Sequence, residues 1–122
     1  MSLDKECKDR SYLYGRLLSI ADRIECSTYD EEKDKKRVTN AKRYMNAFSQ
    51  RPYTTWRVIE ESIQPYLAKL NPGIRIYYSK LLDEVQNLFT LDTFKDNKKL
   101  DGLYLLGFHS QAFEMNNKES EK

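Results

Sequence analysis

The chain has 122 residues, of which 39% are hydrophobic, 12% aromatic and 33% charged, and its formal net charge is +2. This length is typical of one domain, and the apolar content is enough for one core, which excludes a disordered chain. No apolar run approaches the ~20 residues of a membrane span, and the charged N-terminus lacks the apolar segment of a signal peptide. We therefore expect a cytoplasmic protein without membrane contact.

Apolar residues at helical spacing predict an all-α fold, a single antiparallel bundle of about five helices over residues 1–122, with frayed ends at 1–4 and 116–122. The first helix is expected at about Lys5–Cys26. Arg16 is expected to point away from its apolar stripe. That stripe consists of Leu13, Leu17, Ile20 and Ile24.

The second helix is expected at about Asp34–Gln50. It ends at Arg51 because Pro52 disfavours the α conformation in the preceding residue. Its apolar side faces the core. That side consists of Val38, Ala41, Met45 and Phe48.

The third helix is expected at about Thr55–Leu70, with Thr54 or Thr55 as its N-cap. Pro65 lies inside this segment and removes one backbone hydrogen bond, so we expect a kink there. The fourth helix is expected at about Ile74–Phe89, after a turn at Asn71-Pro72-Gly73. A polar connection follows, with one helical turn around Asp92-Thr93-Phe94.

The fifth helix is expected from Gly102 to about Met115, capped by Asp101. Residues 103–108 are apolar on every side, so periodicity alone leaves a buried strand open; because no partner strand is evident, we favour a buried helix. Gly15 and Gly107 each lie inside a predicted helix, where glycine costs about 1 kcal/mol relative to alanine. Both glycines therefore predict a close approach between helices.

Few residues suit catalysis. His109 is the single histidine, and without a nucleophile in visible relation to it we interpret it as a hydrogen-bonded core or boundary residue. Cys7 and Cys26 are expected at opposite ends of one helix, roughly 28 Å apart, and therefore as free thiols. With no glycine-rich phosphate loop and no metal-ligand spacing, we expect no enzyme activity, cofactor, metal or small-molecule substrate.

Positive charge is concentrated in one segment. Residues 31–57 carry eight basic and three acidic side chains, and no Asp or Glu occurs between Lys35 and Arg51. On a helical wheel, the residues that fall opposite the apolar side are Lys36, Thr39, Arg43, Asn46 and Gln50, with Lys35 and Lys42 beside them. The candidate nucleic-acid-binding residues are Lys35, Lys36, Lys42, Arg43, Asn46, Gln50, Arg51 and Arg57.

Cations, amides and hydroxyls suit phosphate oxygens, and Tyr44 and Tyr53 offer stacking surface. A helix face without acids repels itself by a few tenths of a kcal/mol per pair, which an anionic partner would relieve. Two alternatives remain open. The face is an ordinary solvated surface, or it binds an acidic protein surface, in which case the chain is a structural adaptor without nucleic-acid contact.

Three stretches carry a family resemblance. They are residues 10–25 (RSYLYGRLLSIADRIE), residues 39–50 (TNAKRYMNAFSQ) with Thr55-Trp56 after them, and residues 100–111 (LDGLYLLGFHSQ). Over about residues 9–112 the chain resembles the C-terminal part of the large subunit of the subtype I-C CRISPR surveillance complex, Cascade. In that family this part is also made as a small subunit from an internal start codon, and the chain resembles that product or the equivalent segment.

The resemblance implies a non-catalytic helical bundle on the inner face of Cascade. The implied partners are the large subunit, the crRNA-bearing backbone subunits, other copies of the chain, and single-stranded or unwound DNA. Such a subunit supports the displaced non-target strand, and because R-loop formation is nearly balanced, backbone contacts can tip it. Tyr12, Phe113 and Met115 are either interface anchors or core residues.

Overall fold

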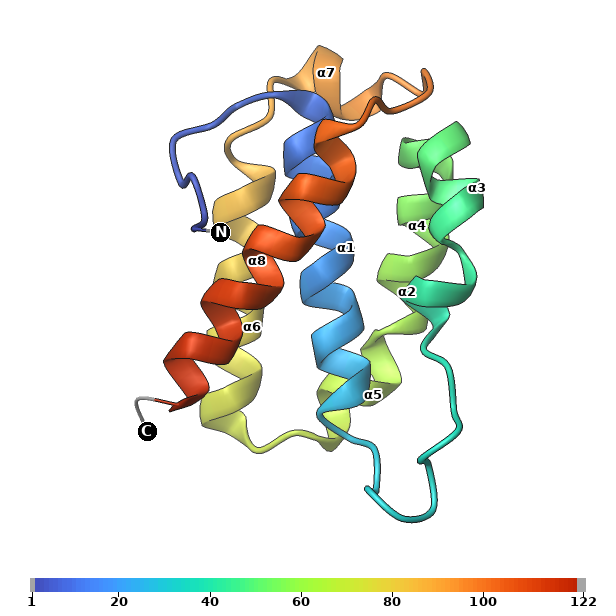
Figure 1. The fold of residues 1–122 in the computed structure, drawn as a ribbon, viewed down its shortest axis with the longest axis vertical. Helices are drawn as coiled ribbons and strands as arrows, with labels where there is room; N and C mark the ends of the chain where they lie inside the picture. Colours follow the sequence, from blue (N-terminus) through green and yellow to red (C-terminus); the bar gives the residue numbers. More distant parts are fainter. Residues whose placement is uncertain (1, 121–122) are drawn as a thin grey trace.

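A computed structural model describes residues 2–120, with side chains for residues 2–117. The described residues form helices and no strands, as predicted (Figure 1). The helices are α1 (Arg10–Cys26), α2 (Asn40–Arg43), α3 (Met45–Gln50), α4 (Pro52–Ser62), α5 (Gln64–Lys69), α6 (Pro72–Gln86), α7 (Leu91–Lys95) and α8 (Leu103–Ser120).

Helix α1 lies at the centre of the molecule. Helices α6 and α8 pack on one side of it, and α2, α4 and α5 contact it as well (Figure 1). Along the chain the direction alternates: α1 runs down, α2–α3 up, α4–α5 down, α6 up and α8 down in the view of Figure 1. Because the chain crosses the molecule an odd number of times, its last helix, α8, runs parallel to its first, α1. These two helices form the most extensive contact.

The contact between α1 and α8 is backbone against backbone. A Cβ atom at Gly15 would overlap the carbonyl oxygen of Tyr104, and one at Gly107 would overlap that of Tyr12. The two glycines therefore permit the crossing from both sides, which confirms the predicted close approach. The backbone N–H of Asp101 donates to the Ser11 hydroxyl at 3.0 Å and joins the starts of the two helices.

Helix α1 is shorter and more deeply buried than predicted. It begins at Arg10, not Lys5, because the Asp9 carboxylate accepts the backbone N–H groups of Ser11 and Tyr12 and caps the helix there. The predicted apolar stripe is fully buried. The prediction that Arg16 points away was wrong: its side chain is only 4% exposed, because α6 and α8 cover the other side of α1.

The predicted second helix is split. Residues 31–36 form turns, and helix begins only at Asn40, where the Thr39 hydroxyl accepts the backbone N–H of Lys42 as N-cap. Tyr44 then separates α2 from α3. The predicted inward residues Ala41, Met45 and Phe48 do pack in the core, whereas Val38 precedes the helix and is exposed.

The third predicted helix is split as well. It begins at Pro52, not at Thr55, and neither Thr54 nor Thr55 caps it, because proline is favoured at a first helical position. The predicted disturbance near Pro65 is confirmed: Ile63 separates α4 from α5, two residues before that proline.

The C-terminal half follows the sequence pattern more closely. Asn71 caps α6 by accepting the backbone N–H of Ile74 at 2.9 Å, so that helix starts two residues earlier than predicted. The helical turn in the polar connection is present as α7. The Asp101 carboxylate accepts the backbone N–H of Leu103 at 2.9 Å at the start of α8, as predicted.

Helix α8 differs from its prediction in two respects. It continues to Ser120, five residues beyond the predicted end at Met115. The fraying expected at residues 1–4 and 116–122 stays a prediction, and residues 1, 121 and 122 lie outside the described residues. Helix α8 is also not buried on all sides, because only one of its sides packs against α1. Tyr12 and Met115 are core residues, whereas several apolar side chains of α8 are exposed. These are Leu103, Leu105, Leu106 and Phe113.

Candidate nucleic-acid interface

Two carboxylates of α1 hold the start of α2. The buried Glu25 accepts both the backbone N–H and the side-chain amide of Asn40 at 3.0 Å, and the Tyr29 hydroxyl donates to the same carboxylate. The Thr39 hydroxyl donates to Asp22. The nearest acids of α1 therefore satisfy polar groups at the N-terminus of α2 and fix its position on the core.

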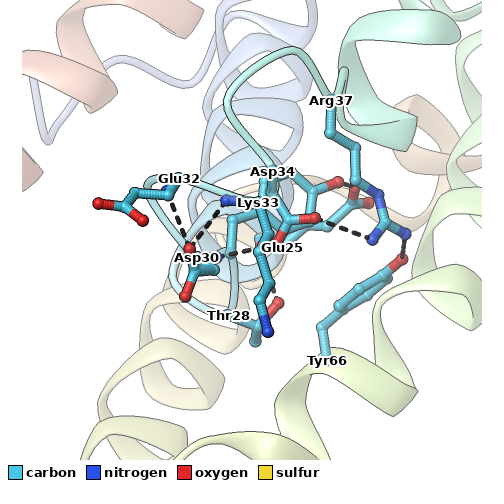
Figure 2. Close-up of polar contacts among 9 residues, drawn as sticks. Glu25, Thr28, Asp30, Glu32, Lys33, Asp34, Arg37 and Tyr66 are labelled. Carbon is cyan, nitrogen blue, oxygen red and sulfur yellow. Dashed lines mark hydrogen bonds and ion pairs between the residues drawn. The ribbon is translucent and has the colours of Figure 1, made fainter.

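The connection between α1 and α2 is ordered by its own polar groups (Figure 2). The Asp30 carboxylate accepts the backbone N–H groups of Lys33 and Glu32, and these two bonds lower its pKa. Arg37 lies 3.6 Å from Asp34, donates to the Tyr66 hydroxyl at 3.2 Å, and stacks 4.9 Å from the centre of the Tyr29 ring. The fold therefore satisfies Arg37, which was not among the candidates.

The outer side of α2 and α3 carries most of the candidates. Helices α2 and α3 lie at one edge of the molecule (Figure 1), and exposed polar side chains lie on the side of these helices away from the buried Ala41 and Phe48. They are Lys42, Arg43, Asn46 and Gln50, followed by Arg51 at the junction with α4, and we call these five residues the basic arm. Tyr44, 38% exposed, lies at the junction between the two helices.

The basic arm has no internal counter-charge. Among the described side chains, none of its three cations forms an ion pair with a carboxylate. Acids are absent from residues 35–51, and Asp22 and Glu25 of α1 are engaged at the start of α2. Desolvation by the fold is also small, since these side chains are exposed. The arm therefore presents exposed cations and amides to solvent.

Arg57 lies on α4 in mixed surroundings. It donates to the Tyr53 hydroxyl at 3.1 Å, and this bond raises the pKa of Arg57, with Glu60 and Glu61 acting in the same direction. The Tyr53 ring packs edge-on against Phe94, so only part of it remains for stacking. Arg57 is exposed, but it does not share the acid-free character of the basic arm.

Lys35 and Lys36 are exposed but lie in the turns before α2, not on a helix. Residues 30–37 contain four acidic and four basic side chains, so their local charge is balanced. The helical wheel that placed Lys36 beside Arg43 therefore does not apply. Thr39, which the wheel placed on the same polar side, is buried as the N-cap.

The sequence does indicate that Thr39 is an N-cap. Thr39-Asn40 precedes an apolar residue at the start of a helical pattern, and threonine and asparagine are favoured at such positions. The pattern of apolar residues had suggested an earlier start. A helix start predicted from this cap, rather than from apolar spacing, excludes Lys35 and Lys36 from the arm.

The described residues contain no group of three or more His, Cys, Asp or Glu side chains arranged to hold a metal ion. None of the helices in the described part of the chain has the length and apolar character that a bilayer span requires. His109 is exposed rather than a core residue, with its ring 5.4 Å from that of Phe108. Cys7 and Cys26 are free thiols, as predicted.

Comparison with protein families identifies the family of the chain. Residues 1–115 match the family described as CRISPR-associated protein (Cas_Csd1), whereas no curated protein sequence is significantly similar. The matched residues include α1 to α7 and α8 as far as Met115, and with them the whole basic arm. The chain therefore belongs to the CRISPR-associated Cas_Csd1 family, the family of the type I-C Cascade large subunit.

Proposed function

We propose that the chain is a non-catalytic small-subunit module of Cascade that binds nucleic-acid backbone and so stabilises target unwinding. The observation that carries this proposal is the basic arm, whose cations have no carboxylate partner among the described residues. Family membership implies a Cascade-related role, and an RNA-guided complex generates unwound DNA. The displaced non-target strand is the ligand that we assign to the arm.

The chemistry of the arm suits a phosphate backbone. Lys42, Arg43 and Arg51 supply positive charge. The side-chain amides of Asn46 and Gln50, which lie between Arg43 and Arg51 in the chain, supply hydrogen-bond donors. Exposed cations lose little hydration before they meet phosphates, so such contacts bind strands without sequence preference. Lys35, Lys36 and Arg57 flank the arm and are assigned secondary phosphate contacts.

Neutralising Lys42, Arg43 and Arg51 to glutamine tests the proposal in assembled Cascade. If each cation meets one phosphate, the slope of log affinity for single-stranded DNA against log salt becomes less steep by about 2. R-loop yield falls with it. The matched control changes Lys95, Lys98 and Lys99 to glutamine. These three lysines are exposed and lie outside the arm, so the control removes the same amount of positive charge. An unchanged slope with the arm variant, or an equal change with the control, contradicts the assignment.

The exposed apolar side of α8 favours a second role, that of a structural adaptor. Leu105, Leu106 and Phe113 are each 43–48% exposed, and an apolar patch on a subunit typically marks a protein interface. We assign this side to neighbouring subunits, including other copies. If the basic arm too contacts protein, the glutamine variant enters Cascade poorly, as native mass spectrometry would show, and the complexes that form keep the wild-type salt slope.

A further inference from the structure

A cavity of about 520 Å³ lies among α1, α6, α8 and the N-terminal segment. Helices α6 and α8 lie on the opposite side of α1 from α2 and α3 (Figure 1), so the cavity is remote from the basic arm. Part of its wall is apolar, formed by Leu81, Leu88 and the Tyr77 ring. Its volume falls within the range of pockets that hold small ligands, about 300–1,000 Å³.

The polar part of the wall contains a buried guanidinium. Arg16 is 4% exposed and donates from Nε to the Gln111 side-chain oxygen at 2.8 Å, and both side chains line the cavity. Its Nη1 atom has no hydrogen-bond partner in the described part of the chain. Buried donors are nearly always satisfied, and an unpaired buried charge is costly. Burial accordingly lowers the pKa of Arg16.

The charged side chains that line the cavity have a net positive charge. Lys5, Arg16 and Lys80 line it together with Glu84 and Glu114. Lys5 lies 3.5 Å from Glu114, and Glu84 forms no ion pair with Arg16 among the described side chains. The five lining side chains, three cations and two anions, have a net charge of +1, while Asp4, which lies outside the lining, acts on Arg16 electrostatically as Glu84 does. A monoanion neutralises this charge, whereas a phosphate dianion or a nucleic-acid strand would meet two carboxylates at close range.

We propose that this cavity binds a carboxylate carried on an apolar body, with the carboxylate on the Arg16 guanidinium and the apolar body against Tyr77, Leu81 and Leu88. A guanidinium fork matches the planar geometry of a carboxylate. The group is supplied by a free organic acid or by an acidic side chain of a neighbouring protein. This site is separate from the basic arm, so its failure leaves the proposed function untouched.

Titration of the full chain with benzoate tests the proposal, with the Gln111 side-chain amide as the NMR reporter. We expect a saturable shift, no comparable shift with the neutral isostere benzamide, and weaker binding of inorganic phosphate. Arg16→Lys keeps the charge but loses the fork, and should weaken benzoate binding at least about tenfold. The proposal is overturned if neither benzoate nor the acidic peptide described below gives a saturable shift, or if benzamide binds as tightly as benzoate.

Two variants at the exposed rim keep the test decisive if Arg16→Lys fails to fold. Lys80→Gln should weaken benzoate binding and Glu84→Gln should strengthen it, because both side chains are exposed and line the cavity with opposite charge. Equal effects of the two variants would overturn the proposal.

Capped peptides distinguish the source of the carboxylate. Tighter binding of acetyl-Leu-Glu-Leu-amide than of benzoate indicates a protein side chain, and the reverse order indicates a free organic acid. Equal binding of acetyl-Leu-Gln-Leu-amide and the glutamate peptide, measured by the same reporter, contradicts both forms of the proposal.

Discussion

The contact between α1 and α8 and the α2–α3 segment that carries the basic arm are built in opposite ways. In the first, two glycines allow two long helices to touch along their backbones, and 13 of the 17 residues of α1 are buried. In the second, helices of four and six residues are held by a few apolar side chains and by carboxylates of α1. Tight packing provides stability, whereas exposure leaves charges available for a partner.

The difference also explains why unpaired cations are tolerated on the arm. Helices this short are marginal by themselves, so their order depends on tertiary anchors. Ala41 and Phe48 supply apolar anchors, and the carboxylates of Glu25 and Asp22 supply polar ones. The outer side is then free to carry like charges, since exposed cations repel one another only weakly in water.

The largest effect is expected at the glycine crossing. Gly15→Ala should lower the free energy of unfolding by about 3 kcal/mol, because the added Cβ meets backbone that cannot move aside without separating α1 from α8. Urea denaturation measures this change. Gly102→Ala is the matched control, since no atom lies within 4 Å of its added Cβ. Equal loss in both variants would remove the distinction between the two regions.

A smaller effect is expected at the cap of α2. Thr39→Ala removes the bond to the Lys42 N–H and the bond to Asp22, and should cost about 1 kcal/mol. Hydrogen exchange should rise in α2 and α3 before it rises in α1. Asn46→Ala, at an exposed position on the same segment, is the control and should leave exchange unchanged. A uniform rise across the whole chain would show that the arm is not an independent local unit.

The smallest effect at neutral pH is expected at Tyr104, which joins the two regions by donating from its hydroxyl to the Met45 carbonyl at 3.3 Å. Burial raises the pKa of Tyr104 to about 12, above the ordinary value of about 10. The folded state therefore retains this proton when the unfolded state loses it, so stability is constant below about pH 10 and declines as pH rises towards about 12.

Tyr104→Phe should flatten part of that alkaline decline, and at pH 7 it should cost less than about 1 kcal/mol. Chemical denaturation at a series of pH values measures both. Tyr44→Phe, at an exposed position, should leave the pH profile as it is. A profile unchanged by Tyr104→Phe would show that the hydroxyl is hydrated in the folded protein.

Helix content, the break near Pro65 and the two close-packed glycines could be predicted, because each depends on local chemistry. The start of α2 could not be predicted from apolar spacing, since Val38 fits the helical period yet precedes the Thr39 cap. Of the candidate site, four residues of the basic arm lie on helices as expected, and the fifth, Arg51, lies at the junction between α3 and α4. Lys35 and Lys36 instead lie in turns whose acids balance their charge.

By itself, the sequence determined an all-helical chain whose acid-free segment at residues 35–51 carries six cations, because helical periodicity and charge follow directly from the order of residues. Only the tertiary structure decided which carboxylates of α1 are engaged at the start of α2, and that Arg16 is buried beside a cavity. The engaged carboxylates depend on α2 packing on α1, and the burial of Arg16 depends on α8 packing on α1 across some ninety residues of chain. No local pattern encodes what covers the far side of a helix.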